Sequence, residues 1–185
     1  TRRSSDLKES RSMQTIKELS VHYSPSDIYS NILKSSVALF LGEVLTSVLR
    51  EESPNADLFD FLEESIVYFD SARDGFANFH IAFLAGLSSF LGFEPGTQSS
   101  IEDHYFDMLN GKFVPVTLVH GNYANKEISG ILAAFFSTSY EKINSIMLKG
   151  TLRNEVLEVL VRYYSLHLPG LKRIKSLEVL KEVFS

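Results

Sequence analysis

The chain has 185 residues, of which 44% are hydrophobic and 22% are charged, and its formal net charge is −5. This length suits one domain with a full hydrophobic core, and this composition is typical of a soluble globular protein and excludes a disordered chain. The sequence contains no cysteine, which excludes disulfides and thiolate metal sites, and it shows neither a membrane span nor a signal peptide. We therefore expect a cytoplasmic protein with no membrane contact.

The first part of the chain combines a strand-like segment with two long helical segments. Residues 11–19, RSMQTIKEL, favour a β-strand, which needs partners elsewhere because a single strand is not stable alone. A long helix is then predicted with Ser24 as its N-cap and Pro25 at its first position. A second helix is predicted to begin at Pro54 or Asn55. The apolar residues of these helices recur at steps of three and four, and those expected to face the core are Leu33, Val37, Phe40, Leu41, Val44, Leu45, Val48, Leu58, Leu62, Ile66 and Phe69.

The remaining segments complete a helical pattern. Residues 76–92, FANFHIAFLAGLSSFLG, are apolar on nearly all sides and are expected to form the buried central helix. Residues 93–124 contain turn dipeptides around a short β-prone run, which predicts a loop with one small hairpin. Further helices are expected at 125–137, 139–149, 152–168 and 176–184, with the N-caps Asn125, Ser139, Thr151 and Ser176.

The pattern as a whole predicts an all-α fold. We expect a helical domain of about six to seven helices, with a small irregular or hairpin insertion and a residual N-terminal strand. The charge is unevenly distributed: residues 43–107 hold two Lys or Arg and thirteen Asp or Glu, whereas both ends of the chain are mildly basic. Such a pattern indicates opposed electrostatic faces if the fold separates these segments, and the alternative is an ordinary solvated helix surface.

Signals for catalysis and for metal binding are weak. The five histidines show no pair at the spacing of helical metal ligands, and His104 with Asp107 is more often a surface pair than a metal site. Ser-x-x-Lys occurs about as often as chance allows, and it lacks the companion motifs of serine acyl-enzymes. Glu43 lies inside an apolar run, and we expect its carboxylate to bond to a nearby helix end or hydroxyl group. The sequence therefore predicts neither an enzyme nor a metal or cofactor site.

Five segments, in this order, resemble landmarks of RecO, the bacterial recombination mediator: KSSVALFLGEVLTSVLREE, NADLFDFLEESI, ANFHIAFLAGLSSFLGFEP, FDMLNGKF and YYSLHLPGLKRIKSLEVLKEVF. The most specific part is the run from Ile174 to Glu178. In this family a helical domain follows an N-terminal OB-fold, so the resemblance implies that residues 1–22 end an OB-fold and residues 23–185 form the helical domain. Many relatives carry a four-cysteine zinc module where this chain has residues 93–124, and without cysteine we expect no zinc there.

The resemblance implies a non-enzymatic role in DNA repair and homologous recombination. RecO proteins bind DNA, anneal complementary single strands and engage RecR. They also bind the acidic C-terminal tail of the single-stranded-DNA-binding protein, so that the recombinase can load. The alternative is a helical protein–protein adaptor with no role on DNA.

Basic residues near both ends of the chain are the candidates for contact with single-stranded DNA. The predicted DNA-binding residues are Arg2, Arg3, Arg11, Lys17, Lys172, Arg173 and Lys175. For the last three, the alternative is that they merely stabilise the end of the preceding helix, where cations meet exposed carbonyl groups.

A second set of residues is predicted to bind the partner tail. Because that tail ends in acidic residues, an apolar residue and a free carboxylate, its receptor needs an apolar cleft with a cation at its mouth. The predicted residues are Arg73, Phe79, Phe83, Leu87, Lys149 and Arg153. We expect Arg153 to bind the carboxylate, because its planar guanidinium group can do so with two hydrogen bonds. The competing interpretation is that the phenylalanines are core residues and that Arg153 pairs with a glutamate on a helix face.

The tail site departs from the family pattern at one point. Some relatives carry basic residues directly before the aromatic residue of the central helix. Here Ala77 and Asn78 stand before Phe79, and Arg73 is the nearest cation. The position of a contact with the tail carboxylate is therefore not fixed by the resemblance.

Overall fold

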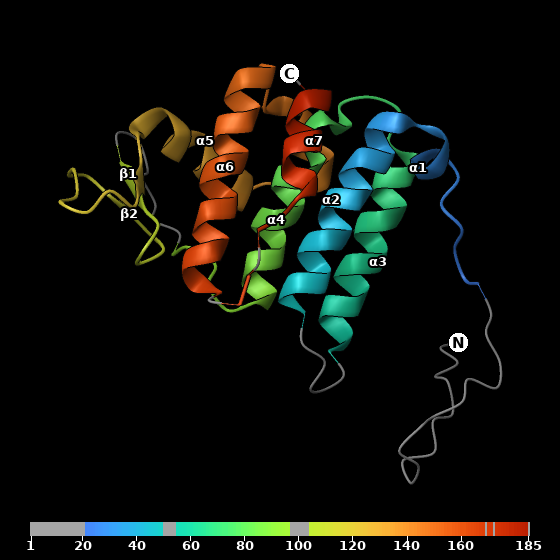
Figure 1. The fold of residues 1–185 in the computed structure, drawn as a ribbon, viewed down its shortest axis with the longest axis horizontal. Helices are drawn as coiled ribbons and strands as arrows, with labels where there is room; N and C mark the ends of the chain where they lie inside the picture. Colours follow the sequence, from blue (N-terminus) through green and yellow to red (C-terminus); the bar gives the residue numbers. More distant parts are fainter. Residues whose placement is uncertain (1–20, 50–54, 97–103, 169, 172, 185) are drawn as a thin grey trace, which may run out of the picture.

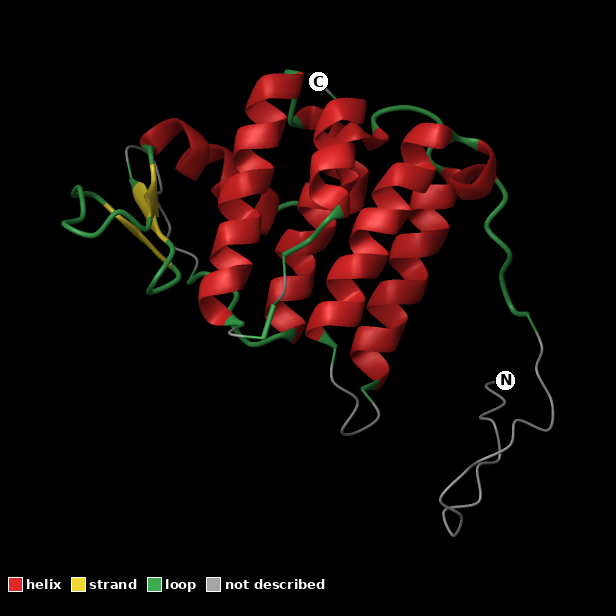
Figure 2. Ribbon diagram, in the orientation of Figure 1, coloured by secondary structure: helices red, strands yellow, loops and turns green. Residues whose placement is uncertain are grey.

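The structure is a computed structural model that describes residues 21–49, 55–96, 104–168, 170–171 and 173–184. Helices form the body of the molecule, and a small sheet lies at one end of it (Figures 1 and 2). The α-helices are α1 (Asp27–Ser30), α2 (Ile32–Val48), α3 (Ala56–Ser71), α4 (Phe79–Phe90), α5 (Lys126–Phe136), α6 (Gly150–His167) and α7 (Ser176–Val183). Two short 3-10 helices are η1 (Phe76–Asn78) and η2 (Tyr140–Ser145). None of these helices is both long and apolar enough to cross a membrane.

The chain is mostly helical, as the sequence predicts, but it is not purely α. The strands β1 (Tyr105–Asp107), β2 (Lys112–Val114) and β3 (Tyr123–Ala124) form an antiparallel sheet in the order β2-β1-β3. The insertion is therefore a three-stranded sheet rather than a loop with one hairpin. The third strand has only two residues, too few to show the alternation of apolar and polar residues that identifies a strand in a sequence.

The central helix is α4, and its burial follows from its composition. Apolar residues surround it on nearly every side, and α3, α5, α6 and η2 pack against it (Figure 1). From α6, the hydroxyl group of Tyr164 donates a hydrogen bond of 2.5 Å to the carbonyl oxygen of Leu84. The prediction of a buried central helix is confirmed.

The predicted first helix is divided in two, which corrects its start. Asn31 has an extended backbone (φ −103°, ψ 117°) and separates α1 from α2. Its side-chain oxygen caps α2 by accepting hydrogen bonds from the N–H groups of Leu33 and Lys34 (3.0 and 3.4 Å). Ser24 and Pro25 lie before α1 and belong to no helix. The periodic pattern continues across Asn31, and so it hides the break.

Other predicted boundaries agree in part. Asn55 and Asn125 cap α3 and α5, since their side-chain oxygens accept hydrogen bonds from the N–H groups three residues later. The helix expected at 139–149 is only the 3-10 helix η2. Thr151 is not a cap, because α6 already begins one residue earlier. Ile66 is exposed rather than buried. The strand expected at residues 11–19 lies outside the described residues.

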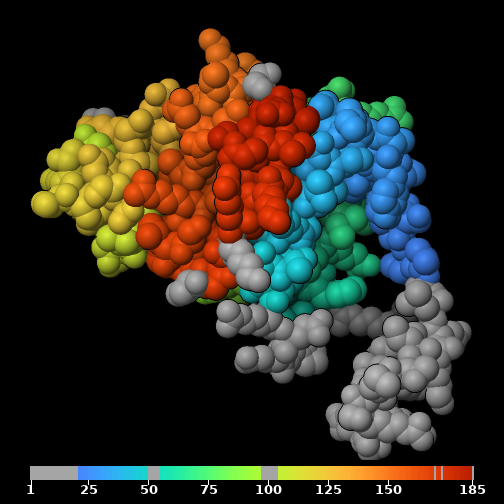
Figure 3. All heavy atoms as spheres, viewed as in Figure 1, coloured from blue at the N-terminus to red at the C-terminus, as the bar shows by residue number. Residues whose placement is uncertain are grey.

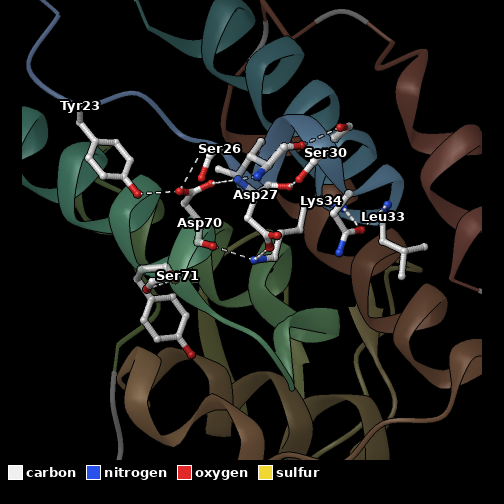
Figure 4. A network of polar contacts seen from close by, with 12 residues as sticks. Tyr23, Ser26, Asp27, Ser30, Leu33, Lys34, Asp70 and Ser71 are labelled. Atoms are coloured by element: carbon white, nitrogen blue, oxygen red, sulfur yellow. Dashed lines mark hydrogen bonds and ion pairs between the residues drawn. The ribbon is translucent and has the colours of Figure 1, made fainter.

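A carboxylate from α3 caps the start of α1. Asp70 is buried, and it accepts a hydrogen bond of 2.7 Å from the hydroxyl group of Tyr23 (Figure 4). It also accepts bonds from three successive backbone N–H groups, those of Ser26, Asp27 and Ile28, at 3.2, 2.9 and 2.8 Å. This one side chain therefore fixes the path of the chain as it enters the helical body.

Lys34 joins the same network from α2. Its side chain is fully buried, and its ammonium group donates to the carbonyl oxygen of Asp70 at 2.9 Å and pairs with the carboxylate of Asp27 at 2.5 Å (Figure 4). The rings of Phe69 and Phe76 lie 5.6 and 5.1 Å from that ammonium group. A buried cation is stable only when its hydrogen bonds and its charge are satisfied, so Lys34 ties α1, α2 and α3 together.

The carboxylate of Glu43, on α2, binds the start of α7. It accepts hydrogen bonds from the hydroxyl group of Ser176 (2.6 Å) and from the backbone N–H groups of Lys175 and Ser176 (2.9 Å each). These bonds, led by that of the hydroxyl group, hold the pKa of Glu43 below its usual value. The prediction that Glu43 bonds to a helix end or a hydroxyl group is confirmed. Ser176 therefore donates hydrogen bonds to Glu43 and is the first residue of α7, not its N-cap.

Candidate functional site

The apolar residues predicted to bind the partner tail lie in the core. Phe79, Phe83 and Leu87 are 2%, 3% and 0% exposed. The ring of Phe79 stacks on that of Phe69, with 4.2 Å between the centroids and 8° between the planes. In this structure a peptide on the surface reaches none of the three. Their placement agrees with the competing interpretation of core packing.

The structure brings two of the three predicted cations together. Lys149 is the N-cap residue of α6 and is exposed, and Arg153 lies in the first turn of the same helix. Arg73 is exposed in the turn between α3 and η1, where it makes no hydrogen bond or ion pair with any described residue. Only Lys149 and Arg153 therefore form a local pair of cations.

The guanidinium group of Arg153 is held by neutral oxygen atoms. Its Nε donates to the side-chain oxygen of Asn78 at 2.8 Å, and Nη2 donates to the carbonyl oxygen of Leu148 at 2.8 Å. Its Nη1 donates to the carbonyl oxygen of Phe184 at 3.4 Å. No carboxylate of the described residues pairs with it, so the expected ion pair with a helix-face glutamate is not formed. Burial lowers the pKa of Arg153, but a guanidinium group stays charged at neutral pH.

His80, on α4, lies near Arg153. It is buried, and its Nδ1 has no hydrogen-bond partner within the described part of the chain. Burial and, to a smaller degree, the charge of Arg153 lower the pKa of His80 to about 3, so the imidazole is neutral at physiological pH. The rings of Phe40 and Phe184 lie 6.3 and 5.7 Å from the imidazole ring. Arg153 therefore borders an aromatic, electrically neutral region.

The start of α6 adds further positive potential. The first N–H groups of a helix lack partners inside the helix and carry a partial positive charge. The side chain of Lys149 cannot accept hydrogen bonds from them, and no side chain in the described part of the molecule caps this helix. Met147, 90% exposed, lies three residues before Gly150, the first residue of α6. We call Met147, Lys149, Arg153 and the first turn of α6 the α6-start site. It combines two cations, open N–H donors and a flexible apolar side chain.

Sequence reasoning identified the cations of this site but missed His80 and Phe184. His80 lies in an apolar run and Phe184 follows an amphipathic segment, where a histidine or a phenylalanine is an ordinary core residue. Only the packing of α4, α6 and α7 brings them next to Arg153 (Figure 1). No local signal in the sequence marks either residue.

The predicted DNA-binding residues fall into two groups. Arg2, Arg3, Arg11, Lys17 and Lys172 lie outside the described residues. Arg173 and Lys175 are exposed on either side of Ile174, which is buried and anchors the segment before α7. This segment meets the N-terminal end of α7, where the helix dipole disfavours cations. The dipole of α7 therefore does not explain why these two cations are present.

Comparison with known proteins gives the family. The family model described as "Recombination protein O C terminal" matches residues 29–178. The chain belongs to the RecO family. Three curated relatives named DNA repair protein RecO are similar to it: that of Phocaeicola vulgatus is 38% identical over 97% of this chain and 75% of its own length, that of Bacteroides fragilis strain YCH46 38% over 97% and 74%, and that of Azobacteroides pseudotrichonymphae 33% over 96% and 73%. No solved structure matches the chain.

The family match places this RecO-family chain among proteins of DNA repair and recombination. The matched residues include all of the α6-start site but end before Phe184. The contact between Phe184 and Arg153 therefore lies partly outside the segment that the family model covers.

Proposed function

We propose that this RecO-family protein is a recombination mediator without catalytic activity. It binds single-stranded DNA, RecR and the acidic tail of the single-stranded-DNA-binding protein, and so supports strand annealing and recombinase loading. Family membership supports the general role in repair, and the family resemblance supports the partners. In the same proposal, residues 1–22 end an OB-fold and residues 23–185 form the helical domain that follows it.

Tail binding is proposed because the guanidinium group of Arg153 is held in a fixed orientation and has no carboxylate partner among the described residues. A guanidinium group has five N–H donors, and three hydrogen bonds to neutral oxygen atoms fix its orientation here. The remaining donors make no hydrogen bond with the described residues and can bind a carboxylate. A group that is already oriented loses little entropy when it binds its ligand. The guanidinium group of Arg153 is therefore preorganised to bind an anion.

The other parts of the α6-start site suit the rest of the tail. The terminal carboxylate meets Arg153 and the N–H groups of the first turn of α6, an arrangement that favours anions. The acidic residues before it meet Lys149. The last apolar side chain of the tail packs on Met147, whose flexible thioether adapts to different partners. This assignment replaces the buried residues of α4 with the half-buried Arg153 and the exposed Met147 and Lys149.

Substitution of Arg153 tests the proposal. We expect Arg153→Gln to weaken binding of a labelled acidic peptide, which ends in phenylalanine with a free carboxylate, by about tenfold or more, or about 1.4 kcal/mol. The wild type should bind the amidated peptide similarly weakly, because that peptide offers Arg153 no charged partner. Fluorescence anisotropy measures both affinities.

Arg162→Gln is the matched control, because Arg162 lies exposed on the same helix and bonds to Asn122. Neither this change nor Arg73→Ala should alter the affinity. If Arg153→Gln changes the affinity by less than about threefold, under 1 kcal/mol, the tail does not bind at the α6-start site.

Binding of single-stranded DNA is expected to be weak and strongly dependent on salt, because few exposed cations are available. Neutralising Lys172, Arg173 and Lys175 to Gln should weaken this binding and reduce the slope of log affinity against log salt by about 0.7 for each phosphate group that is no longer neutralised. Glutamine is preferred to glutamate because position 175 lies beside Glu43.

Lys142→Gln, an exposed cation of η2, is the control for this experiment. Titration of a labelled oligonucleotide at several salt concentrations measures the slope. An unchanged slope in the triple variant would place the DNA contact elsewhere. If the wild type shows no salt-dependent binding at all, the result favours the adaptor with no role on DNA.

A further inference from the structure

Phe184, directly after α7, touches Arg153 with two different groups. Its ring centroid lies 5.7 Å from the guanidinium carbon, and its carbonyl oxygen accepts the bond of 3.4 Å from Nη1. On its other side, the ring meets His80 at 5.7 Å. An aromatic ring and an oxygen atom on one residue are also what a phenylalanine with a free carboxylate would present to Arg153.

The contact between Phe184 and Arg153 is weaker than the contact that a phenylalanine with a free carboxylate would make with Arg153. A carbonyl oxygen carries no net charge, and a distance of 3.4 Å is long for a hydrogen bond from a guanidinium group. A carboxylate accepts shorter and roughly twice as strong bonds from such a group. The contact also leaves Nδ1 of His80 without a partner among the described residues. Phe184 therefore gives Arg153 only a weak hydrogen bond and gives Nδ1 of His80 none.

The two ends of α7 are held with different strength. Its start is fixed by three hydrogen bonds to Glu43 and by the buried side chain of Ile174, and Leu180 anchors the helix further along. An exposed ion pair between Lys181 and Glu158 adds little, because surface pairs contribute at most about 1 kcal/mol.

The end of α7 meets the helical body through Phe184, through the ion pair of Lys181 with Glu158, and through a hydrogen bond of 3.3 Å that Asn154 donates to the carbonyl oxygen of Lys181. Phe184 contacts Arg153 on α6 and His80 on α4, and its one hydrogen bond to them is the long bond from Nη1. Figure 3 shows α7 on the surface, beside α6 and α2. Because one long hydrogen bond and two ring contacts join Phe184 to these two residues, Phe184 can leave Arg153 while the helix up to Leu180 stays in place.

We propose that Phe184 is an internal competitor at the α6-start site, and that an acidic peptide ending in an aromatic residue binds by displacing it. Since Phe184 and the peptide contact the same guanidinium group, they exclude each other. The apparent affinity for the peptide is then the intrinsic affinity multiplied by the fraction of molecules in which Phe184 is displaced. This inference rests on the proposed tail-binding function and adds a regulatory element to it.

The substitution Phe184→Ala in the full chain separates the two claims. We expect the affinity for the labelled acidic peptide that ends in phenylalanine to rise about fivefold or more, the factor by which a mostly closed competitor lowers apparent affinity. Val179→Ala is the control, because Val179 is exposed on the same helix, and it should leave the affinity unchanged. Thermal unfolding of both variants shows that the fold is retained.

An NMR titration of the wild type gives a second readout that needs no substitution. The amide signals of Val183 and Phe184 should move toward unfolded values as the peptide binds, whereas those of Leu177 and Leu180 should stay. Signals of Val183 and Phe184 that remain at their folded positions at saturation would overturn the inference.

The outcomes distinguish the inference from the proposed function. If Phe184→Ala weakens binding or leaves it unchanged while Arg153→Gln weakens it about tenfold or more, the tail site stands and Phe184 is not a competitor. If neither substitution alters the affinity, both the competitor and the site are wrong. A rise in affinity with Phe184→Ala that disappears in the double variant with Arg153→Gln supports both.

Discussion

Phe79→Ala is expected to lower the free energy of unfolding by about 3–5 kcal/mol, the usual cost of removing a buried aromatic ring. The ring is 2% exposed and packs against those of Phe69, at 4.2 Å, and Tyr140, at 5.4 Å. Both neighbours belong to larger rigid elements, so they cannot collapse into the cavity without disturbing α3 and η2. Urea unfolding followed by circular dichroism measures the change.

Ile66→Ala is the matched control, because Ile66 is 45% exposed on the neighbouring helix α3 and should cost about 1 kcal/mol or less. The experiment also tests the role first predicted for Phe79 in binding the partner tail. If Phe79→Ala leaves the stability within about 1 kcal/mol of the wild type and removes peptide binding, the residue belongs to a binding surface and not to the core.

Asp70→Ala is expected to cost about 3 kcal/mol, because it leaves one buried and three partly buried donors without an acceptor. Three backbone N–H groups at the start of α1 and the hydroxyl group of Tyr23 are deprived of their acceptor at once (Figure 4). Asp70→Asn should cost less, since an amide oxygen still accepts some of these bonds. Urea unfolding of both variants near neutral pH gives the comparison.

The same substitution should change how stability depends on pH. Burial alone would raise the pKa of Asp70, but the hydrogen bonds from Ile28, Tyr23, Ser26 and Asp27 outweigh it and keep the pKa below the usual 3.8. A carboxylate whose pKa is lower in the folded state stabilises the protein fully above its unfolded pKa. That stabilisation is lost as the pH falls through the folded pKa.

The wild type should therefore lose stability as the pH falls below about 4, with Glu43 contributing in the same direction from its lowered pKa. Without its carboxylate at position 70, the Asp70→Ala variant should lose less stability over this range. Equal acid sensitivity of the two proteins would mean that Asp70 is not the group whose protonation destabilises the fold.

Local signals in the sequence predicted much of the fold. The all-apolar run of α4 is long and unambiguous, and Asn55 and Asn125 each stand directly before a periodic segment. The break at Asn31 was missed because its effect is local while the apolar period runs on. The buried Lys34 was also missed, since its partners Asp27 and Asp70 come from α1 and α3 and only the tertiary fold assembles them.

The proposed α6-start site shares its two cations, but not its apolar part, with the residues that the sequence suggested, for a similar reason. Charge and position at a helix start identified Lys149 and Arg153. The apolar half was assigned to α4 because its surplus of phenylalanine resembles an exposed surface when the neighbouring elements are unknown. In the structure α3 and η2 cover that surplus with Phe69, Tyr68 and Tyr140. A sequence pattern shows which residues are apolar, but not which neighbour buries them.

The most direct measurement is an NMR titration of the wild-type protein with the acidic peptide that ends in phenylalanine, beside the same peptide with an amidated end. The free carboxylate should shift the amide signals of Gly150, Thr151 and Leu152 and the guanidinium signals of Arg153, because these donors meet it. The amidated peptide should shift them far less. Equal shifts with both peptides, or shifts confined to other helices, would contradict tail binding at the α6-start site.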